Sequence, residues 1–192
     1  MNATDVVEGF QLIRDLTPQQ IDEVCRLRLE AWRGQARLKP NATEWRDEWD
    51  ADAHHVAAID TQGRIAGGFR LTLHTLPTDS DHLPDEGVWA AAAATLPQPV
   101  AYMCRLFVSP DHRGRGLARA LDQAAFLEPP RHGARAGVAL TGSVLNNRAR
   151  VETMERYGWQ TSGEAKRVPN TSVFFADFVP LVLSFVVGGK AQ

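Results

Sequence analysis

A short glycine-rich segment between a strand and a helix restricts the fold of this chain more than any other feature. Residues 106–118 contain the end of an apolar strand, a Pro-Asp turn and then Arg-Gly-Arg-Gly at the start of a helix. Because glycine has no Cβ, such a loop lets backbone N–H groups point into a shared concavity, and the helix N-terminus adds partial positive charge. The segment is therefore typical of a pyrophosphate cradle in an α/β protein.

Two common phosphate-binding motifs do not fit this segment. The glycine spacing differs from the dinucleotide-binding fingerprint, and no acidic residue closes a following strand. No Lys-Ser/Thr follows the glycine, so the segment is not a Walker loop. A turn rich in solvated arginine remains the alternative, but the position between a buried strand and an amphipathic helix favours a ligand site.

The segment resembles the signature of the GNAT N-acyltransferase superfamily, Arg/Gln-x-x-Gly-x-Gly/Ala, which is matched by Arg113, Gly116 and Ala118. The expected order of elements also agrees along nearly the whole chain: strand, two helices, three strands, the motif helix, a strand, a helix and two strands. The resemblance implies an α/β fold with a mixed, mostly antiparallel central sheet of about seven strands, flanked by about four helices.

Hydrophobic periodicity predicts where these elements lie. Strands are expected at 10–14, 55–59, 65–73, 100–108 and 137–144, with two more after Trp159; helices are expected from 17 to 34, around Trp45 and Trp49, from 117 to the Pro129-Pro130 pair, and over 147–157. On the first helix, Cys25 falls on the apolar stripe and is expected in the core.

Residues 75–99 carry four prolines and an alanine run, unlike the sequence around them. Since a hairpin usually needs only a few connecting residues, we expect an insertion, with a short helix near 88–96, between the third and fourth strands. It would serve as a lid or an acceptor site. A length of 192 residues with 44% apolar residues otherwise describes one globular domain, so residues 1–192 are expected to form a single N-acyltransferase domain.

The resemblance implies coenzyme A as the bound cofactor and acetyl-CoA as the acyl donor. Its pyrophosphate would lie on the backbone of residues 113–118, and its pantetheine arm would pair like an extra strand with the end of strand 100–108. The expected coenzyme-binding residues are Leu106, Phe107, Val108, Arg113, Gly114, Arg115, Gly116, Leu117, Ala118 and Asn147. No metal is expected, because no histidine has a cysteine or carboxylate at a metal-ligand spacing.

In this family an amine attacks the thioester directly. A backbone N–H at the splayed end of the strand would polarise the thioester carbonyl and hold the developing oxyanion. A general base then takes the amine proton, and a general acid protonates the departing thiolate. Each proton transfer is typically worth about 10²- to 10⁴-fold in rate.

The catalytic positions of the family are occupied differently here. Met154 stands where the family has its proton-donating tyrosine, and Tyr157 lies three residues further along the helix, so Tyr157 is the candidate acid. The alternative is a core tyrosine beside Trp159. Tyr102 stands where several members have a glutamate base. An unperturbed phenol is a poor base at neutral pH, so Tyr102 is a candidate for orienting the substrate or relaying a proton, with a buried strand tyrosine as the alternative.

Two other residue groups have two interpretations each. Cys104 shares a strand face with Tyr102, and an acyl relay through its thiol would need an activating base that the sequence does not show. In the insertion, the acidic residues either attract an amine or form a solvated loop; they are Asp79, Asp81, Asp85 and Glu86.

The sequence thus predicts an enzyme that transfers acetyl from acetyl-CoA to the amine of a small molecule or peptide in a ternary complex. A second alternative uses a longer acyl chain, since residues 64–108 resemble the acyl-homoserine-lactone and long-chain N-acyl amino acid synthases; a deep apolar tunnel behind strand 100–108 would distinguish it. A third is a catalytically silent acyl-CoA sensor or scaffold, motivated by Met154 and Tyr102.

Charge and hydropathy restrict the partners. The net charge of −2 gives no pull toward nucleic acid or anionic lipid. The apolar stretch 178–187 is interrupted by Pro180 and is too short for a bilayer span, so it is a strand pair or a contact between two copies of the chain in a homodimer. The first residues lack the basic and apolar regions of an export signal, which predicts a cytoplasmic protein.

Overall fold

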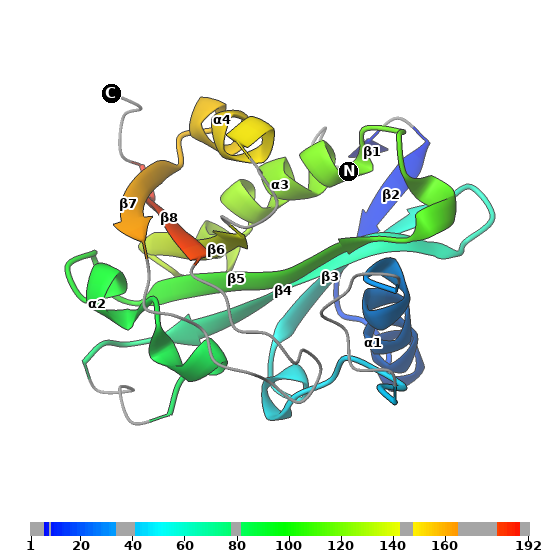
Figure 1. Cartoon of the computed structure of the whole chain (residues 1–192), viewed down its shortest axis with the longest axis horizontal. Coiled ribbons are helices and arrows are strands. Elements are labelled where there is room, and N and C mark those ends of the chain that lie inside the picture. The colour runs from blue at the N-terminus through cyan, green and yellow to red at the C-terminus, as the bar shows by residue number, and fades with distance from the viewer. Residues whose placement is uncertain are drawn as a thin grey trace.

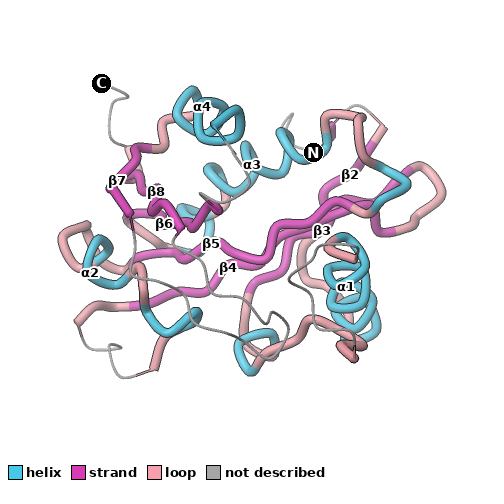
Figure 2. Tube along the Cα trace, viewed as in Figure 1, coloured by secondary structure: helices cyan, strands magenta, loops and turns pink. Residues whose placement is uncertain are grey.

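The computed structural model describes residues 6–7, 9–33, 41–77, 82–142, 148–164 and 180–188. Within these ranges one eight-stranded sheet has the order β1-β2-β3-β4-β5-β6-β8-β7 (Figures 1 and 2). The strands are β1 (Val6–Val7), β2 (Phe10–Ile13), β3 (His54–Asp60), β4 (Ile65–His74), β5 (Val100–Val108), β6 (Ala136–Gly142), β7 (Gln160–Glu164) and β8 (Pro180–Val186). All neighbours are antiparallel except the parallel pair β5 and β6.

Helices cover both faces of this sheet. The α-helices are α1 (Pro18–Ala31), α2 (Ala90–Ala93), α3 (Leu117–Leu127) and α4 (Arg148–Arg156), and short 3-10 helices are η1 (Glu48–Asp50), η2 (Pro84–Gly87), η3 (Pro110–His112) and η4 (Pro129–His132). In Figure 1, α3 and α4 lie on one face of the sheet, and α1 lies on the other. The expected mixed, mostly antiparallel α/β fold is confirmed, with β1 as a short additional edge strand.

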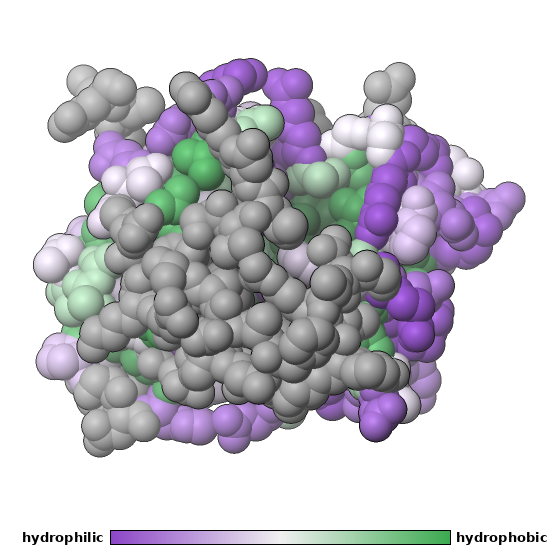
Figure 3. Space-filling view, viewed as in Figure 1, coloured by the Kyte–Doolittle hydropathy of each residue, from purple (hydrophilic) through white to green (hydrophobic). Residues whose placement is uncertain are grey.

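The apolar core follows these layers. The largest cluster packs α3 against the sheet through Leu117, Leu121 and their neighbours. On the opposite face, α1 packs on Phe107 and Ala57, while the insertion covers a separate apolar cluster around Trp89. In the view of Figure 3, hydrophilic residues gather on the right, over α1 and the β3–β4 turn.

Helix α1 begins and packs as its sequence predicts. Thr17 forms a capping box with Gln20, its hydroxyl accepting from the Gln20 backbone N–H, and Pro18 occupies the first turn. Cys25 is fully buried, as expected from the apolar stripe. Burial raises the pKa of the Cys25 thiol to about 11, so this group is an inert core residue.

The second expected helix is wrong in extent. Only one 3-10 turn, η1, forms, and Trp45 precedes it in non-helical chain. Asp47 is the N-cap of η1: its carboxylate accepts from the Trp49 N–H, and Asp50 accepts from the Asp47 N–H, so the turn begins after Asp47 and Trp45 lies outside it. The insertion likewise has a shorter helix than expected, since α2 spans four residues and follows η2.

Within the apolar C-terminal stretch, residues 180–186 form a single strand, β8. Strand β8 pairs with β6 on one side and with β7 on the other. A contact between two copies of the chain stays a prediction. No helix in the described part of the chain is long and apolar enough to span a bilayer.

Candidate active site

Strands β5 and β6 separate in the middle of the sheet. Their parallel ladder runs from Val100 and Ala136 to Met103 and Ala139, yet β5 continues to Val108 and β6 to Gly142. Within the described residues, no ladder pair joins the two strands beyond that point. The β5 main chain from Cys104 to Val108 therefore keeps its β6-side edge available to an extended ligand. We call this place the fork.

A β-bulge bends β5 at the fork. Gly68 faces Phe107 and Arg70 faces Cys104, so Phe69 alone opposes Arg105 and Leu106. Arg105 adopts a φ of 59°, the left-handed region that non-glycine residues rarely occupy. A bulge bends its strand and sharpens the local twist. It therefore accounts for the departure of β5 from β6.

The glycine-rich segment follows β5 directly and forms an open loop. Gly114 and Gly116 have φ values of 73° and 78°, and a Cβ built on either would meet no atom within 4 Å. Gly116 caps α3, whose first helical hydrogen bond runs from the Ala120 N–H to the Gly116 carbonyl. The N–H groups of residues 117–119 thus have no partner within the helix. Bare backbone and a helix N-terminus together make a surface suited to an anion.

The arginines of this loop are each held by the protein. Arg113 donates to the Ala31 carbonyl at the end of α1, a position that favours a cation. The Arg115 guanidinium lies over the Phe10 ring, 4.6 Å from its centroid. Arg119 Nε donates to the Tyr157 hydroxyl at 3.0 Å. All three side chains are exposed, so their charge remains beside the loop.

His112 joins the glycine-rich loop to the β3–β4 turn. It is buried, with its Nδ1 2.9 Å from Ser109 Oγ and its Nε2 3.2 Å from Asp60 Oδ2. Asp60 also accepts from the backbone N–H groups of Gln62 and Arg64, which form the turn. Ser109 and His112 line a pocket of about 420 Å³. His112 thus has two protein partners and acts as a tether behind the loop.

Tyr102 is buried beside the fork. Its hydroxyl donates to Asp85 Oδ2 at 2.6 Å, and its ring stacks on Trp89 with centroids 4.6 Å apart. Burial, followed by the charge of Asp85, raises the pKa of Tyr102 well above its ordinary value. This geometry favours the buried-tyrosine interpretation over a proton relay.

Cys104 lies on the same face as Tyr102, as expected. Its Sγ accepts from Arg70 Nε at 3.4 Å. Burial raises the pKa of the Cys104 thiol despite the opposing charges of Arg70 and Arg105. Because the thiolate is the nucleophile, this environment does not favour an acyl relay.

The helix after β6 places the two proton-donor positions differently. Met154 on α4 is buried in the core against α3. Tyr157, just beyond the end of α4, is half-buried, and its hydroxyl lies beside the first turn of α3 through the contact with Arg119. Since Arg119 donates to the hydroxyl oxygen, the phenolic hydrogen remains available for donation. Asn147 lies outside the described residues.

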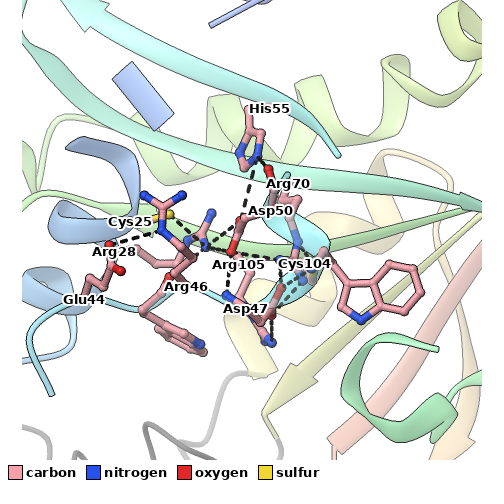
Figure 4. Close-up of polar contacts among 12 residues, drawn as sticks. Cys25, Arg28, Glu44, Arg46, Asp47, Asp50, His55, Arg70, Cys104 and Arg105 are labelled. Atoms are coloured by element: carbon pink, nitrogen blue, oxygen red, sulfur yellow. Dashed lines mark hydrogen bonds and ion pairs between the residues drawn. The ribbon is translucent and has the colours of Figure 1, made fainter. Parts of the chain in front are cut away.

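A cluster of buried and half-buried charged residues occupies the α1 face next to the fork. It consists of Arg28, Asp47, Asp50, Arg70, Asp85 and Arg105, named here the Arg–Asp cluster. Figure 4 labels these residues apart from Asp85. Arg70 binds both Asp47 and, at 3.1 Å, Asp50; Arg105 bridges Asp47 and Asp85 at 2.9 Å each. Figure 4 shows the labelled members pointing toward one another from α1, η1, β4 and β5. Three cations and three anions leave the cluster neutral.

The cluster fixes the ionisation of its members. Burial alone would raise the pKa of Asp47, but Arg70 and Arg105 outweigh it and lower the pKa to about 2. Burial is outweighed in the same way at Asp50, where Arg28 and Arg70 lower the pKa. The carboxylates are therefore charged over the physiological range.

Sequence reasoning missed this cluster, although two signals were present. Arg28 lies three residues after Cys25 and four after Val24, so it belongs to the apolar stripe of α1. Arg70 and Arg105 each interrupt a strand that is otherwise largely apolar. A cation inside a buried pattern requires a buried anion, but the sequence could not show which of its 23 acidic residues supplies it.

The fork and the open glycine loop lie together in one mixed α/β sheet, and comparison with known proteins identifies the family that has this fold. The model of the acetyltransferase (GNAT) family matches residues 21–159. Because this match covers more than half of the chain, the chain belongs to the GNAT acetyltransferase family. A search of curated proteins finds no match.

Solved structures with the same fold are similar over nearly the full chain. A protein provisionally assigned as a phosphinothricin N-acetyltransferase has a TM-score of 0.64 at 16% identity, covering 92% of this chain and 98% of its own. The ribosomal-protein-S18-alanine N-acetyltransferase from Escherichia coli has a TM-score of 0.60 at 13% identity, covering 94% and 96%. The structure of yncA from Salmonella typhimurium with its cofactor acetyl-CoA has a TM-score of 0.60 at 15% identity, covering 95% and 96%. At these identities the likeness shows the fold.

Proposed function

We propose that residues 1–192 form one N-acetyltransferase domain, which transfers acetyl from acetyl-CoA to the amine of a small molecule or peptide. The observation that carries the proposal is the fork on β5, followed at once by a loop whose two glycines leave the backbone open. This is the arrangement that an extended pantetheine arm ending in a diphosphate requires.

In this proposal the coenzyme lies along β5 and the start of α3. The main chain of Leu106, Phe107 and Val108 holds the pantetheine arm. Residues 113–118 hold the pyrophosphate, and the charges of the loop arginines support it electrostatically. Asn147, which lies outside the described residues, stays a prediction as a further coenzyme contact. The structure of yncA with its cofactor acetyl-CoA supports the choice of cofactor.

The chemistry needs no covalent enzyme intermediate. The amine nitrogen attacks the thioester carbon, while a main-chain N–H at the fork stabilises the oxyanion. The C–S bond then breaks, and the thiolate takes a proton. Tyr157 is our candidate proton donor, since its hydroxyl oxygen accepts from Arg119 and its hydrogen remains available for donation. The raised pKa of Tyr102 makes that residue a poor base, so we assign its role to shaping the site and the amine proton to water.

The acceptor amine approaches on the face that carries α1 and the insertion, opposite α3. Asp85 does not act there as a free attracting charge, because Tyr102 and Arg105 already bind its carboxylate. Asp79 and Asp81 lie outside the described residues, so attraction of an amine by the acidic insertion stays a prediction for them. The residues on this face determine which amine is accepted. Activity against a panel of amines would identify the chemical class of the acceptor.

The coenzyme site can be tested with a matched pair of glycines. Gly116 and Gly133 have φ values of 78° and 76°, and a Cβ on either meets nothing within 4 Å. Replacing either with alanine places a left-handed alanine in the chain at a cost of about 1–2 kcal/mol. Only Gly116→Ala adds a Cβ to the proposed cradle, so we expect acetyl-CoA affinity to fall at least tenfold there and to stay unchanged in Gly133→Ala. Equal affinities in the two variants would reject the cradle.

Turnover separates the enzyme from a silent sensor. Ligand at 100 times its Kd stabilises a fold by about 2.7 kcal/mol, so both alternatives predict a shift in melting temperature with acetyl-CoA. Release of free coenzyme A from acetyl-CoA in the presence of a primary amine is expected only of the enzyme. Binding without release across the panel would favour the sensor.

A further inference from the structure

An apolar cluster lies directly beyond the fork, on the face opposite α3. Cys104 on β5 and Leu140 on β6 are the first residues of this face past the last ladder pair, and both pack against the cluster. Its buried members come from β5, β6, β8 and the insertion; they are Leu76, Leu83, Trp89, Ala93, Val100, Tyr102, Ala136, Val138 and Val182. An acyl group that passes through the fork from the coenzyme side therefore points into this cluster.

The centre of the cluster is a stack of two rings. The indole of Trp89 and the phenol ring of Tyr102 are 4.6 Å apart between centroids with an interplanar angle of 9°, and both residues are 0–1% exposed. Trp89 comes from the insertion, whereas Tyr102 is the last residue of its face within the β5–β6 ladder. The insertion thus places its largest side chain immediately below the fork.

Hydrogen bonds lock both rings in place. Trp89 Nε1 donates to the Pro84 carbonyl at 3.0 Å, and the Tyr102 hydroxyl donates to Asp85 Oδ2 at 2.6 Å. Asp85 is itself held by Arg105, so the stack is tied to the Arg–Asp cluster. A ring fixed at its polar end and packed on both sides does not move aside without breaking these contacts. The stack is therefore a rigid wall.

We propose that the Trp89–Tyr102 stack is the floor of the acyl site and restricts the donor to short acyl groups, with Trp89 as the specificity-determining residue. This inference rests on the proposed function. An acetyl group ends at the fork, whereas each further methylene would have to enter the space that Trp89 fills. One methylene too many in an apolar pocket typically costs roughly 10- to 200-fold in kcat/KM.

Removal of the indole should open this floor. An apolar cavity of roughly 150 Å³ is large enough to hold a benzene molecule, so the vacancy left by Trp89→Ala has room for a few methylenes. Trp89→Phe keeps an aromatic wall and should open it less. Trp159→Leu is the matched control, because Trp159 is equally buried but packs in the core on the α3 face.

The test measures kcat/KM for acetyl-, butyryl- and hexanoyl-CoA with one amine, together with the Kd of each acyl-CoA as a readout that needs no acceptor. For the unaltered protein we expect butyryl-CoA to be at least tenfold worse than acetyl-CoA. Trp89→Ala should improve the butyryl-to-acetyl ratio at least tenfold, and Trp89→Phe should move it in the same direction by less. Trp159→Leu should lower the melting temperature and leave the ratio unchanged.

The outcomes distinguish failure of the proposed floor from failure of the proposed function. If the unaltered protein uses hexanoyl-CoA as well as acetyl-CoA, or if folded Trp89 variants keep the original ratio, the floor is wrong while the acyltransferase stands. If no acyl-CoA is bound or turned over by the unaltered protein, the proposed function itself fails. Should Trp89→Ala not fold, Trp89→Phe and Trp89→Leu carry the same comparison.

Discussion

The glycine-rich loop and the Arg–Asp cluster lie at the two sides of the fork and are built on opposite principles. The loop presents backbone N–H groups to a ligand, because a Cβ on either of its glycines would meet no atom within 4 Å. The arginines beside it each have a partner within the protein. The cluster is made of side chains, and Arg28 and Arg70 are fully buried in it. Substitutions in the glycine-rich loop should therefore change ligand affinity, whereas substitutions in the Arg–Asp cluster should change the free energy of unfolding.

The largest effect should come from breaking the cluster. Asp50 is the partner of both Arg28, at 3.0 Å, and Arg70, at 3.1 Å. Asp50→Ala leaves two buried cations short of an anion, so we expect the free energy of unfolding to fall by about 3–5 kcal/mol. Denaturant unfolding measures this. Glu23→Ala, which removes an exposed partner of Arg26, is the control and should cost less than about 1 kcal/mol.

Acid should weaken the cluster through Asp47. Its folded-state pKa of about 2 lies below the ordinary value of 3.8, so the stabilisation is present above pH 4 and is lost as the pH falls through 2. The loss attributable to this group is about 2 kcal/mol. Unfolding at several pH values in this window should show a shallower decline for Asp47→Asn than for the unaltered protein. If the free energy of unfolding fell equally with pH in both proteins, the ion pairs assigned to Asp47 would be wrong.

On the coenzyme side, Tyr157→Phe tests chemistry: it leaves the glycines of the cradle unchanged and removes only the hydroxyl that accepts from Arg119. Removing the phenolic proton should lower turnover more than tenfold, with little change in the affinity for acetyl-CoA. Steady-state kinetics and a binding titration together make this measurement. Unchanged turnover would reassign the proton donor to water.

The smallest expected effect is at Arg115. Its contact with Phe10 is worth about 0.5–1 kcal/mol at an exposed site, so Arg115→Ala should cost little stability. It should weaken acetyl-CoA binding a few-fold at low salt and less at high salt, because exposed charges are screened. The exposed Arg131, beyond the far end of α3, provides the control. If the affinity for acetyl-CoA had the same salt dependence in Arg115→Ala and Arg131→Ala, Arg115 would not lie near the bound ligand.

The sequence predicted the parts of this molecule that depend on local patterns. Strand β5 has the expected bounds, and α3 begins at the expected glycine. Cys25 lies in the core because helical periodicity alone decides its face. These features follow from neighbours within one or two turns of the chain.

The rest depends on contacts between distant segments. The left-handed Arg105 arises from its pairing with β4 and its bonds to Asp47 and Asp85, which are 58 and 20 residues away. Trp89 meets Tyr102 only because the insertion folds back on β5. Composition could identify the insertion as unusual, but not which of its residues would reach the sheet.

The bulge at Arg105 reverses the alternation of β5. Before it, even-numbered Tyr102 and Cys104 face the insertion side; after it, odd-numbered Phe107 faces that same side, while Leu106 and Val108 pack toward α3. Deletion of a single residue here would restore a regular ladder and exchange the two faces of the strand end. Phe107 would then leave its position beneath α1. Among descendants of this gene, β5 should therefore accept exchanges of side chain far more readily than any change in its length.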